Sequence, residues 1–176
     1  MLKSIPDSEY FDRVKRLQKR MEEEDLDAVL CYGDEGLCHN LRYLTKYWPL
    51  FEVGGVLVGR TGNPLVLIGG EAPEFGAQTP FGMDSVRGCS DFGHTSGTVH
   101  DWIGVKYYSL KELFHQVTDG KGVKRLGVGD YAITPHRLYK KMEEACLPGG
   151  QLIDCGDILV DLRMNKTPAE IEMVRQ

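Results

Sequence analysis

Long apolar stretches are missing from this sequence. Runs such as Val56-Leu57-Val58 and Leu65-Val66-Leu67-Ile68 are far shorter than the roughly 20 residues that a membrane-spanning helix requires. The N-terminal segment MLKSIPDSEYFDRVKR contains no apolar core of the kind found in signal peptides. We therefore expect a cytoplasmic protein with no membrane partner.

Paired cysteines are missing too. The five cysteines are an odd number, lie far apart and form no CxxC pair. This pattern argues against a disulfide framework and against a zinc ribbon. Cys31 and Cys155 lie in the apolar segments AVLCY and LIDCGDIL, so we expect buried thiols of a protein kept in a reducing compartment.

An excess of positive charge is absent as well. The 21 Lys and Arg residues are outnumbered by 26 Asp and Glu residues, which gives a net charge of −5. Such a protein repels phosphate backbones, and we find no stripe of basic residues with interleaved aromatics, so we expect no nucleic-acid partner. The 176 residues, 41% of them hydrophobic, are typical of one globular domain with its own core.

The sequence does contain alternating helix and strand patterns. A first helix is expected over EYFDRVKRLQKRMEEE, after Pro6 and with Asp7 or Ser8 as its N-cap. Its predicted apolar face consists of Tyr10, Val14, Leu17 and Met21. The other predicted elements are a strand at Leu26–Gly33, a short helix and turn within His39–Pro49, a hairpin of VGGVLVGR and NPLVLIGG, a strand near Asp84–Arg87, a helix after the capping box of Ser109 and Glu112, a strand at Arg125–Asp130, a helix from Thr134 and Pro135, and a last strand at Leu152–Leu159.

Strands that alternate with helices, together with one hairpin, indicate an α/β fold with a mixed sheet and helices on both faces. We find no internal repeat and no inner linker, so we expect one domain.

The chain ends just after another helix begins. Thr167 offers an N-cap hydroxyl, Pro168 favours the first helical position, and Glu170 can reach back to the cap. No residue that closes a helix follows before Gln176. Because an isolated helix needs roughly 12–15 residues to persist in water, we expect further chain beyond this point.

The C-terminal third and one shorter motif resemble a known family. The segment NLRYLT, from Asn40 to Thr45, is similar to a family motif that ends in Tyr-Leu-Thr-Gly, although Lys46 stands where the glycine would be. Together with the ending, these residues resemble the N-terminal domain of the creatinase/prolidase family, the pita-bread metallopeptidases that include the Xaa-Pro peptidases. The residues of the ending that carry the resemblance are Leu162-Arg163, Lys166, Pro168, Glu170-Ile171 and Arg175.

The resemblance implies a ribonuclease H-like α/β domain over residues 1–165. Residues 166–176 would start the helix that leads into an absent C-terminal catalytic domain. In that domain the family's peptidases hold two divalent metal ions with two Asp, one His and two Glu residues, whereas creatinase works without metal through a His residue. The resemblance therefore implies no catalytic residue, no metal ligand and no cofactor in this chain.

The function implied by the resemblance is that of a non-catalytic domain of a metallohydrolase, an Xaa-Pro dipeptidase or aminopeptidase. The domain would serve oligomerisation, as a homodimer, and would restrict access of peptide substrates. Two alternatives stay open: a stand-alone binding module on the same fold, and the N-terminal domain of a non-peptidase, creatinase-like hydrolase.

One segment, RYLTKYWPLF, gathers aromatic residues beside two cations. Exposed aromatics with Arg are typical of interface anchors, and family members use this domain at the rim of a neighbouring subunit's active site. We therefore expect an interface or active-site rim here; the alternative is that Tyr43, Leu44 and Trp48 pack against the first helix. The candidate rim residues are Arg42, Tyr43, Lys46 and Trp48.

Two further groups of residues are weaker candidates for a metal site and for a nucleophile. Asp91, His94, His100 and Asp101 are the ligand types of a divalent metal, but their spacing fits no helix or hairpin and a solvated loop is the alternative. For a cysteine nucleophile, Cys38 with His39 as its base is the only pair adjacent in the sequence, although neighbours in a chain seldom point at each other.

Overall fold

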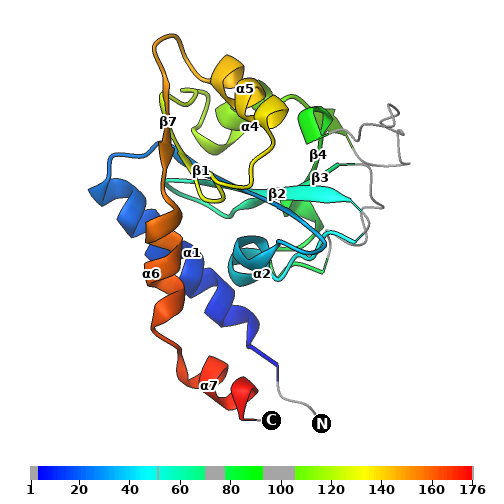
Figure 1. Cartoon of the computed structure of the whole chain (residues 1–176), viewed down its shortest axis with the longest axis vertical. Coiled ribbons are helices and arrows are strands. Elements are labelled where there is room, and N and C mark those ends of the chain that lie inside the picture. The colour runs from blue at the N-terminus through cyan, green and yellow to red at the C-terminus, as the bar shows by residue number, and fades with distance from the viewer. Residues whose placement is uncertain (1–3, 51, 70–77, 93–105, 176) are drawn as a thin grey trace.

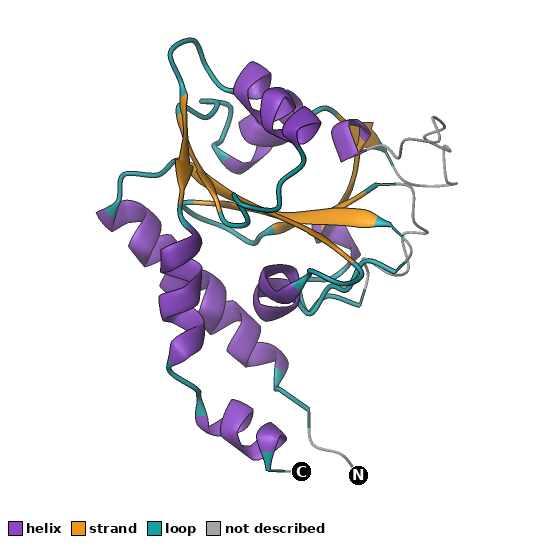
Figure 2. Cartoon of the chain, viewed as in Figure 1, coloured by secondary structure: helices purple, strands orange, loops and turns teal. Residues whose placement is uncertain are grey.

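The computed structural model describes residues 4–50, 52–69, 78–92 and 106–175, and a seven-stranded sheet lies at its centre (Figure 1, Figure 2). The strands are β1 (Ala28–Asp34), β2 (Val53–Gly59), β3 (Leu65–Ile68), β4 (Val86–Cys89), β5 (Tyr107–Tyr108), β6 (Arg125–Val128) and β7 (Gln151–Asp154). The helices are α1 (Asp7–Glu23), α2 (His39–Thr45), α4 (Leu110–Val117), α5 (His136–Ala145), α6 (Gly156–Met164) and α7 (Pro168–Val174), with short 3₁₀ turns η1 (Met83–Ser85) and η2 (Ser90–Phe92).

The sheet is mixed, with the order β5-β4-β3-β2-β1-β6-β7. β1 is its hub: Leu30 lies opposite Leu57 of antiparallel β2 on one side and opposite Val128 of parallel β6 on the other. β2 and β3 pair antiparallel, which confirms the predicted hairpin. The remaining neighbours, β3 with β4, β4 with β5 and β6 with β7, are parallel.

Helices cover both faces of this sheet, as the sequence predicts. α1, α2 and α6 lie on one face and α4 and α5 on the other (Figure 2). Alternate residues of β1 therefore enter different cores: Val29 and Cys31 pack with α1 and α2, whereas Leu30 and Tyr32 pack with α4. The expected burial of Cys31 and Cys155 is confirmed.

Local sequence signals fix several helix positions. The predicted apolar face of α1 is buried throughout. The capping box of Ser109 and Glu112 opens α4, and that of Thr167 and Glu170 opens α7, both with the reciprocal bonds in place. The cap predicted for α1 is wrong, because Pro6 occupies the N-cap with no side-chain bond, and Asp7 is already helical.

The strand predicted at Leu152–Leu159 is wrong in its second half. β7 ends at Asp154, and α6 begins at Gly156. The segment DILV, with its three apolar residues, is compatible with a strand or a helix. The helix is favoured because it buries Ile158 and Leu159 against α1.

Two other boundaries shift. The helix expected from Thr134 starts at His136, because Thr134 is held in a turn by hydrogen bonds from its N–H and its hydroxyl to the Asp130 carbonyl, at 3.0 and 2.9 Å. The strand expected near Asp84–Arg87 begins at Val86, after a 3₁₀ turn.

Candidate functional site

The predicted rim segment starts on α2 and continues into the turn after it. α2 ends at Thr45, and Lys46 follows in the left-handed conformation, with φ of 65° and its N–H bonded to the Arg42 carbonyl at 3.0 Å. A side chain costs about 1 kcal/mol in this conformation, which glycine adopts freely. Lys46 in this conformation ends α2 sharply, and the chain then continues toward Trp48.

Arg42 and Trp48 meet at the surface after this turn. The guanidinium carbon of Arg42 lies 5.2 Å from the centroid of the Trp48 ring, within range of a cation–π interaction. The Trp48 indole N–H donates to the Glu35 carbonyl at 3.0 Å, which fixes the ring, yet 43% of the residue stays exposed. Trp48 therefore presents a fixed aromatic ring at the surface, and Arg42 places a positive charge over it.

Tyr43 points inward instead. It is 8% exposed, its hydroxyl donates to the Leu162 carbonyl of α6 at 2.7 Å, and Leu44 beside it is fully buried. The structure therefore brings Arg42 and Trp48 together at the surface and places Tyr43 in the support behind them.

A buried charge, Arg13 of α1, organises this support and was not foreseen from the sequence. Its guanidinium lies over the rings of Tyr10 and Tyr43, at 4.9 and 4.4 Å, and donates to the Tyr43 carbonyl at 2.8 Å and to Glu170 Oε1 at 2.9 Å. Arg13 thus links α1, α2 and α7. The sequence signal that could have indicated it is the position of Arg13 at helical spacing among the apolar residues of the α1 face.

A cavity of about 470 Å³ opens between α1, α2, α6 and α7. Among the described residues of its lining Glu170 alone is acidic, and it is already paired with Arg13. The lining also contains the cations Arg42, Lys46, Arg163 and Lys166, and the imidazole of His39, whose pKa is lowered by burial and by the charge of Arg163. Cations gathered in this way favour carboxylate or phosphate groups.

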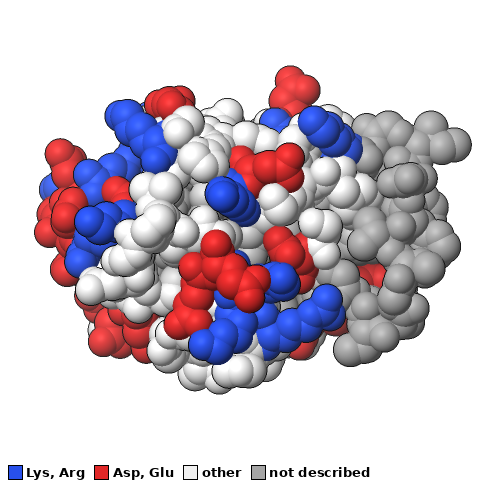
Figure 3. All heavy atoms as spheres, turned by 90° about the horizontal axis from the view of Figure 1, so that it is seen from above, with Lys and Arg blue, Asp and Glu red and all other residues white. Residues whose placement is uncertain are grey.

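The layer of α4 and α5, on the opposite face of the sheet, has a different charge pattern. On the face seen in Figure 3, basic and acidic side chains are intermixed. On α5, for example, Lys140 pairs with Glu143 at 2.7 Å and Lys141 with Glu144 at 2.9 Å. Such exposed pairs neutralise each other and create no site for an anion.

Of the weak metal alternative, one member can be placed. Asp91 lies in η2, where its carboxylate accepts from the Leu110 N–H at 2.8 Å and so supports the start of α4. His94, His100 and Asp101 lie outside the described residues. Within the described ranges, no three His, Cys, Asp or Glu side chains gather so that they could hold a metal ion.

Cys38 lacks the character of a nucleophile. Burial raises the pKa of its thiol, and its Sγ is 3.9 Å from the Glu35 carbonyl. A raised pKa reduces the thiolate fraction at neutral pH, which is the reverse of what an attacking cysteine requires.

Comparison with solved structures places this geometry in a known fold. The chain is 19% identical to the Xaa-Pro dipeptidase from Bacillus anthracis, with a TM-score of 0.61 over 93% of this chain and 38% of that one. It is 16% identical to the dipeptidase PepE from Mycobacterium ulcerans, with a TM-score of 0.65 over 96% of this chain and 40% of that one. A proline dipeptidase chain from Streptococcus pneumoniae is 15% identical, with a TM-score of 0.61 over 87% of this chain and 98% of that one.

The chain spans about two fifths of the length of the first two structures. No curated protein matches it by sequence. The family model of the creatinase/prolidase N-terminal domain matches residues 13–165, which covers the sheet, α2, α4, α5, α6 and the part of α1 from Arg13 onward. The chain belongs to the creatinase/prolidase N-terminal domain family.

Proposed function

We propose that this chain is the non-catalytic N-terminal domain of a prolidase-type metallohydrolase, an Xaa-Pro dipeptidase or aminopeptidase. The family match over residues 13–165 carries this proposal. It is supported by the neighbours of dipeptidase and aminopeptidase P type, two of which are about two and a half times as long as this chain. The family resemblance assigns the two divalent ions of the peptidases to their catalytic domain, and we propose no metal ligand in this chain.

The domain would act through its surface, at dimer contacts and at the mouth of an active site. Trp48 is large, stiff and held by its indole N–H, so it can exclude water and limit substrate length at little entropic cost. Arg42 and Lys46 lie beside the cationic cavity, where they can meet a peptide's terminal carboxylate. The expected effect is on selection of substrates rather than on bond cleavage.

A cytoplasmic location fits the same proposal. All five cysteines are free thiols, and among the described helices none is long and apolar enough to cross a bilayer. One structural neighbour is the N-terminal domain of the cytoplasmic peptidase PepQ from Mycobacterium tuberculosis.

The first test concerns catalysis. The purified chain should not turn over an Xaa-Pro dipeptide, with or without manganese, cobalt or zinc. Metal-dependent turnover that survives repurification and disappears on substitution of His94 or His100 would overturn the proposal. Sequencing the coding region past Gln176 separates the alternatives, because an Asp, Asp, His, Glu, Glu ligand order supports a peptidase and its absence supports a binding module.

The second test uses Trp48→Ala in the protein that carries the catalytic domain. We expect KM to rise about fivefold, or the limit on substrate length to relax, with metal content unchanged, as loss of an aromatic anchor implies. Met83→Ala is the control, because Met83 is similarly exposed, at 51%, but lies in η1 on another part of the sheet. If the rim acts across a dimer, mixing Trp48→Ala subunits with metal-site mutants should restore part of the activity. Unchanged kinetics in a folded Trp48→Ala protein would exclude the rim role.

A further inference from the structure

The carboxyl ends of β6 and β7 form a topological switch point. The chain leaves β6 for α5 on one face of the sheet, whereas it leaves β7 for α6 on the other (Figure 1). Adjacent parallel strands whose connections diverge in this way leave a crevice outside their carboxyl ends, where α/β proteins commonly bind ligands. A pocket of about 320 Å³ occupies this place, a size at the lower end for small-molecule sites.

The floor of this pocket consists of two buried polar side chains, Asn40 of α2 and Asp130 after β6. They are 2% and 6% exposed. The Asn40 amide donates to Asp130 Oδ1 at 2.9 Å and to the Gly129 carbonyl at 3.4 Å, so its nitrogen is fully used. Asn40 Oδ1 and Asp130 Oδ2 have no hydrogen-bond partner among the described residues. Two buried acceptors left in this state call for a donor, since an unmet buried acceptor costs about 1–3 kcal/mol.

The rim of the pocket carries both signs of charge. Asp154 at the end of β7 and Asp157 in the first turn of α6 add two carboxylates, whereas Arg163 supplies a cation and His39 an imidazole whose pKa is lowered by burial. The Arg163 Nε–H donates to the Leu159 carbonyl at 3.3 Å, and its two terminal amino groups have no hydrogen-bond partner in the described ranges. A buried acceptor floor with a guanidinium at the rim matches a ligand that is cationic at one end and anionic at the other.

We infer that this pocket binds a small zwitterion, a free α-amino acid, whose ammonium group donates to Asp130 Oδ2 and Asn40 Oδ1 while its carboxylate accepts from Arg163. The His39 imidazole lies between the floor and the surface: its Nε2 is 3.4 Å from Asp130 Oδ1, and 47% of the side chain is exposed. This inference does not depend on the proposed function, because it needs no catalytic domain and uses a neighbouring pocket that shares only His39 and Arg163 with the first cavity.

The charge state of the floor agrees with this ligand. Burial raises the pKa of Asp130 to about 6, against the lowering effects of the Asn40 amide, the Arg163 charge and the nearby Tyr32 N–H. At pH 7 Asp130 is therefore mostly ionised and able to balance an ammonium group. A metal ion is a poorer candidate, because the described side chains of the pocket do not supply three ligands in one place.

The test is an NMR titration of the ¹⁵N-labelled chain at pH 7 with glycine, methylamine and acetate. Glycine should shift the amides of Gly129–Ile133, Gly156 and Asp157 saturably and should bind at least about tenfold more tightly than either half-ligand, since it alone engages both ends. Equal binding of methylamine and glycine would overturn the assignment of Arg163 and the zwitterion. No saturable shift with glycine would overturn the site itself.

Variants sharpen the result. Arg163→Gln should weaken glycine binding about tenfold and leave methylamine binding unchanged. Arg137→Gln is the matched control, because Arg137 is exposed on α5 outside the lining of the pocket. Asp130→Asn should abolish binding of both amines; the titration of the native chain decides the question if this variant does not fold. Glycine binding that survives both Arg163→Gln and Asp130→Asn in folded proteins would refute the inference.

Discussion

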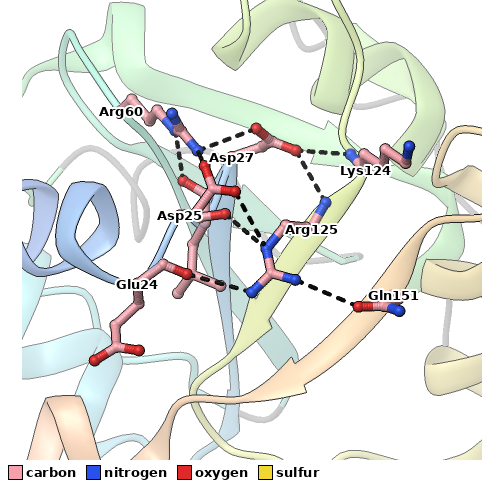
Figure 4. A network of polar contacts seen from close by, with 8 residues as sticks. Glu24, Asp25, Asp27, Arg60, Lys124, Arg125 and Gln151 are labelled. Atoms are coloured by element: carbon pink, nitrogen blue, oxygen red, sulfur yellow. Dashed lines mark hydrogen bonds and ion pairs between the residues drawn. The ribbon is translucent and has the colours of Figure 1, made fainter.

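At the amino ends of β1 and β6, Asp27 Oδ2 accepts hydrogen bonds from the backbone N–H groups of Lys124 and Arg125, both at 2.9 Å (Figure 4). Arg60 meets Asp25 at 2.6 Å and Asp27 at 3.4 Å, and Arg125 donates to the carbonyl of Asp25. The carboxylates of Asp25 and Asp27 and the guanidinium groups of Arg60 and Arg125 all have partners in this network. The network joins the starts of β1 and β6 to the end of β2.

At the carboxyl ends of the same parallel strands, the polar groups are more deeply buried but incompletely paired. Asn40 and Asp130 satisfy each other through one contact of 2.9 Å and direct one oxygen each to no partner in the described structure. Paired charges thus join the amino ends of the sheet, whereas two buried acceptors at the carboxyl ends lack a partner in the described structure, which is the basis of the ligand site that we propose.

The largest effect is expected from breaking the amino-end network with Asp27→Ala. Two backbone N–H groups lose a charged acceptor and Arg60 loses a partner, so the free energy of unfolding should fall by about 2–3 kcal/mol. Thermal unfolding should shift downward by about 5–10 °C. Asp84→Ala, at an exposed position in η1, is the control and should stay within about 0.5 kcal/mol of the native protein. An equal shift in the two variants would show that the network does not stabilise the sheet.

An intermediate effect is expected from Asp130→Asn, which probes the carboxyl ends. The raised pKa of Asp130, about 6 against 3.8, means that the folded protein binds this proton more tightly than the unfolded chain. The stability that protonation supplies is therefore present at low pH and is lost as the pH rises through about 6. Between pH 7 and pH 5 the native protein should gain on the order of 1 kcal/mol relative to the variant.

Denaturant unfolding of both proteins at the two pH values measures this difference. The double comparison cancels the titration of all other groups, provided that the variant keeps the Asn40 contact. Parallel pH profiles for the native protein and the variant would show that burial does not raise the pKa of Asp130. The two ends of the sheet would then not differ in the electrostatic cost of their buried groups.

The sequence predicts the elements that depend on local signals better than those that depend on distant contacts. Capping boxes and helical spacing are local, so α4 and the start of α7 were predicted with their caps. The hairpin followed from a turn signal between two apolar runs. Elements whose identity depends on distant packing were harder: α6 was mistaken for strand because only contact with α1 distinguishes the two.

The site residues follow this rule as well. Arg42 and Trp48 are six positions apart, and their shared segment was identified from composition alone. Arg13 and Glu170 are 157 positions apart, and Asn40 and Asp130 are 90 apart. No local pattern predicts such pairs. They are brought together by the parallel register of β1, β6 and β7 and by the packing of α1 on α6.

The smallest effect is expected at α7, which continues from the carboxyl-end side of the sheet through α6. None of its residues is buried, and its seven residues are fewer than an isolated helix needs. The capping box and the bond from Arg13 to Glu170 act on its first turn. We therefore expect the amides of Glu172–Arg175 to exchange with solvent much faster than those of Val160–Arg163 in α6.

Hydrogen exchange followed by NMR on the monomeric chain measures this difference directly. The α6 amides are the internal control, because Ile158 and Leu159 anchor that helix in the core. Strong protection of Glu172–Arg175 would mean that Arg13 and the cap suffice to hold all of α7, and no packing partner would be required. Fast exchange there, beside a protected α6, would place the limit of autonomous stability between the two helices, within a residue or two of where the family match ends at residue 165.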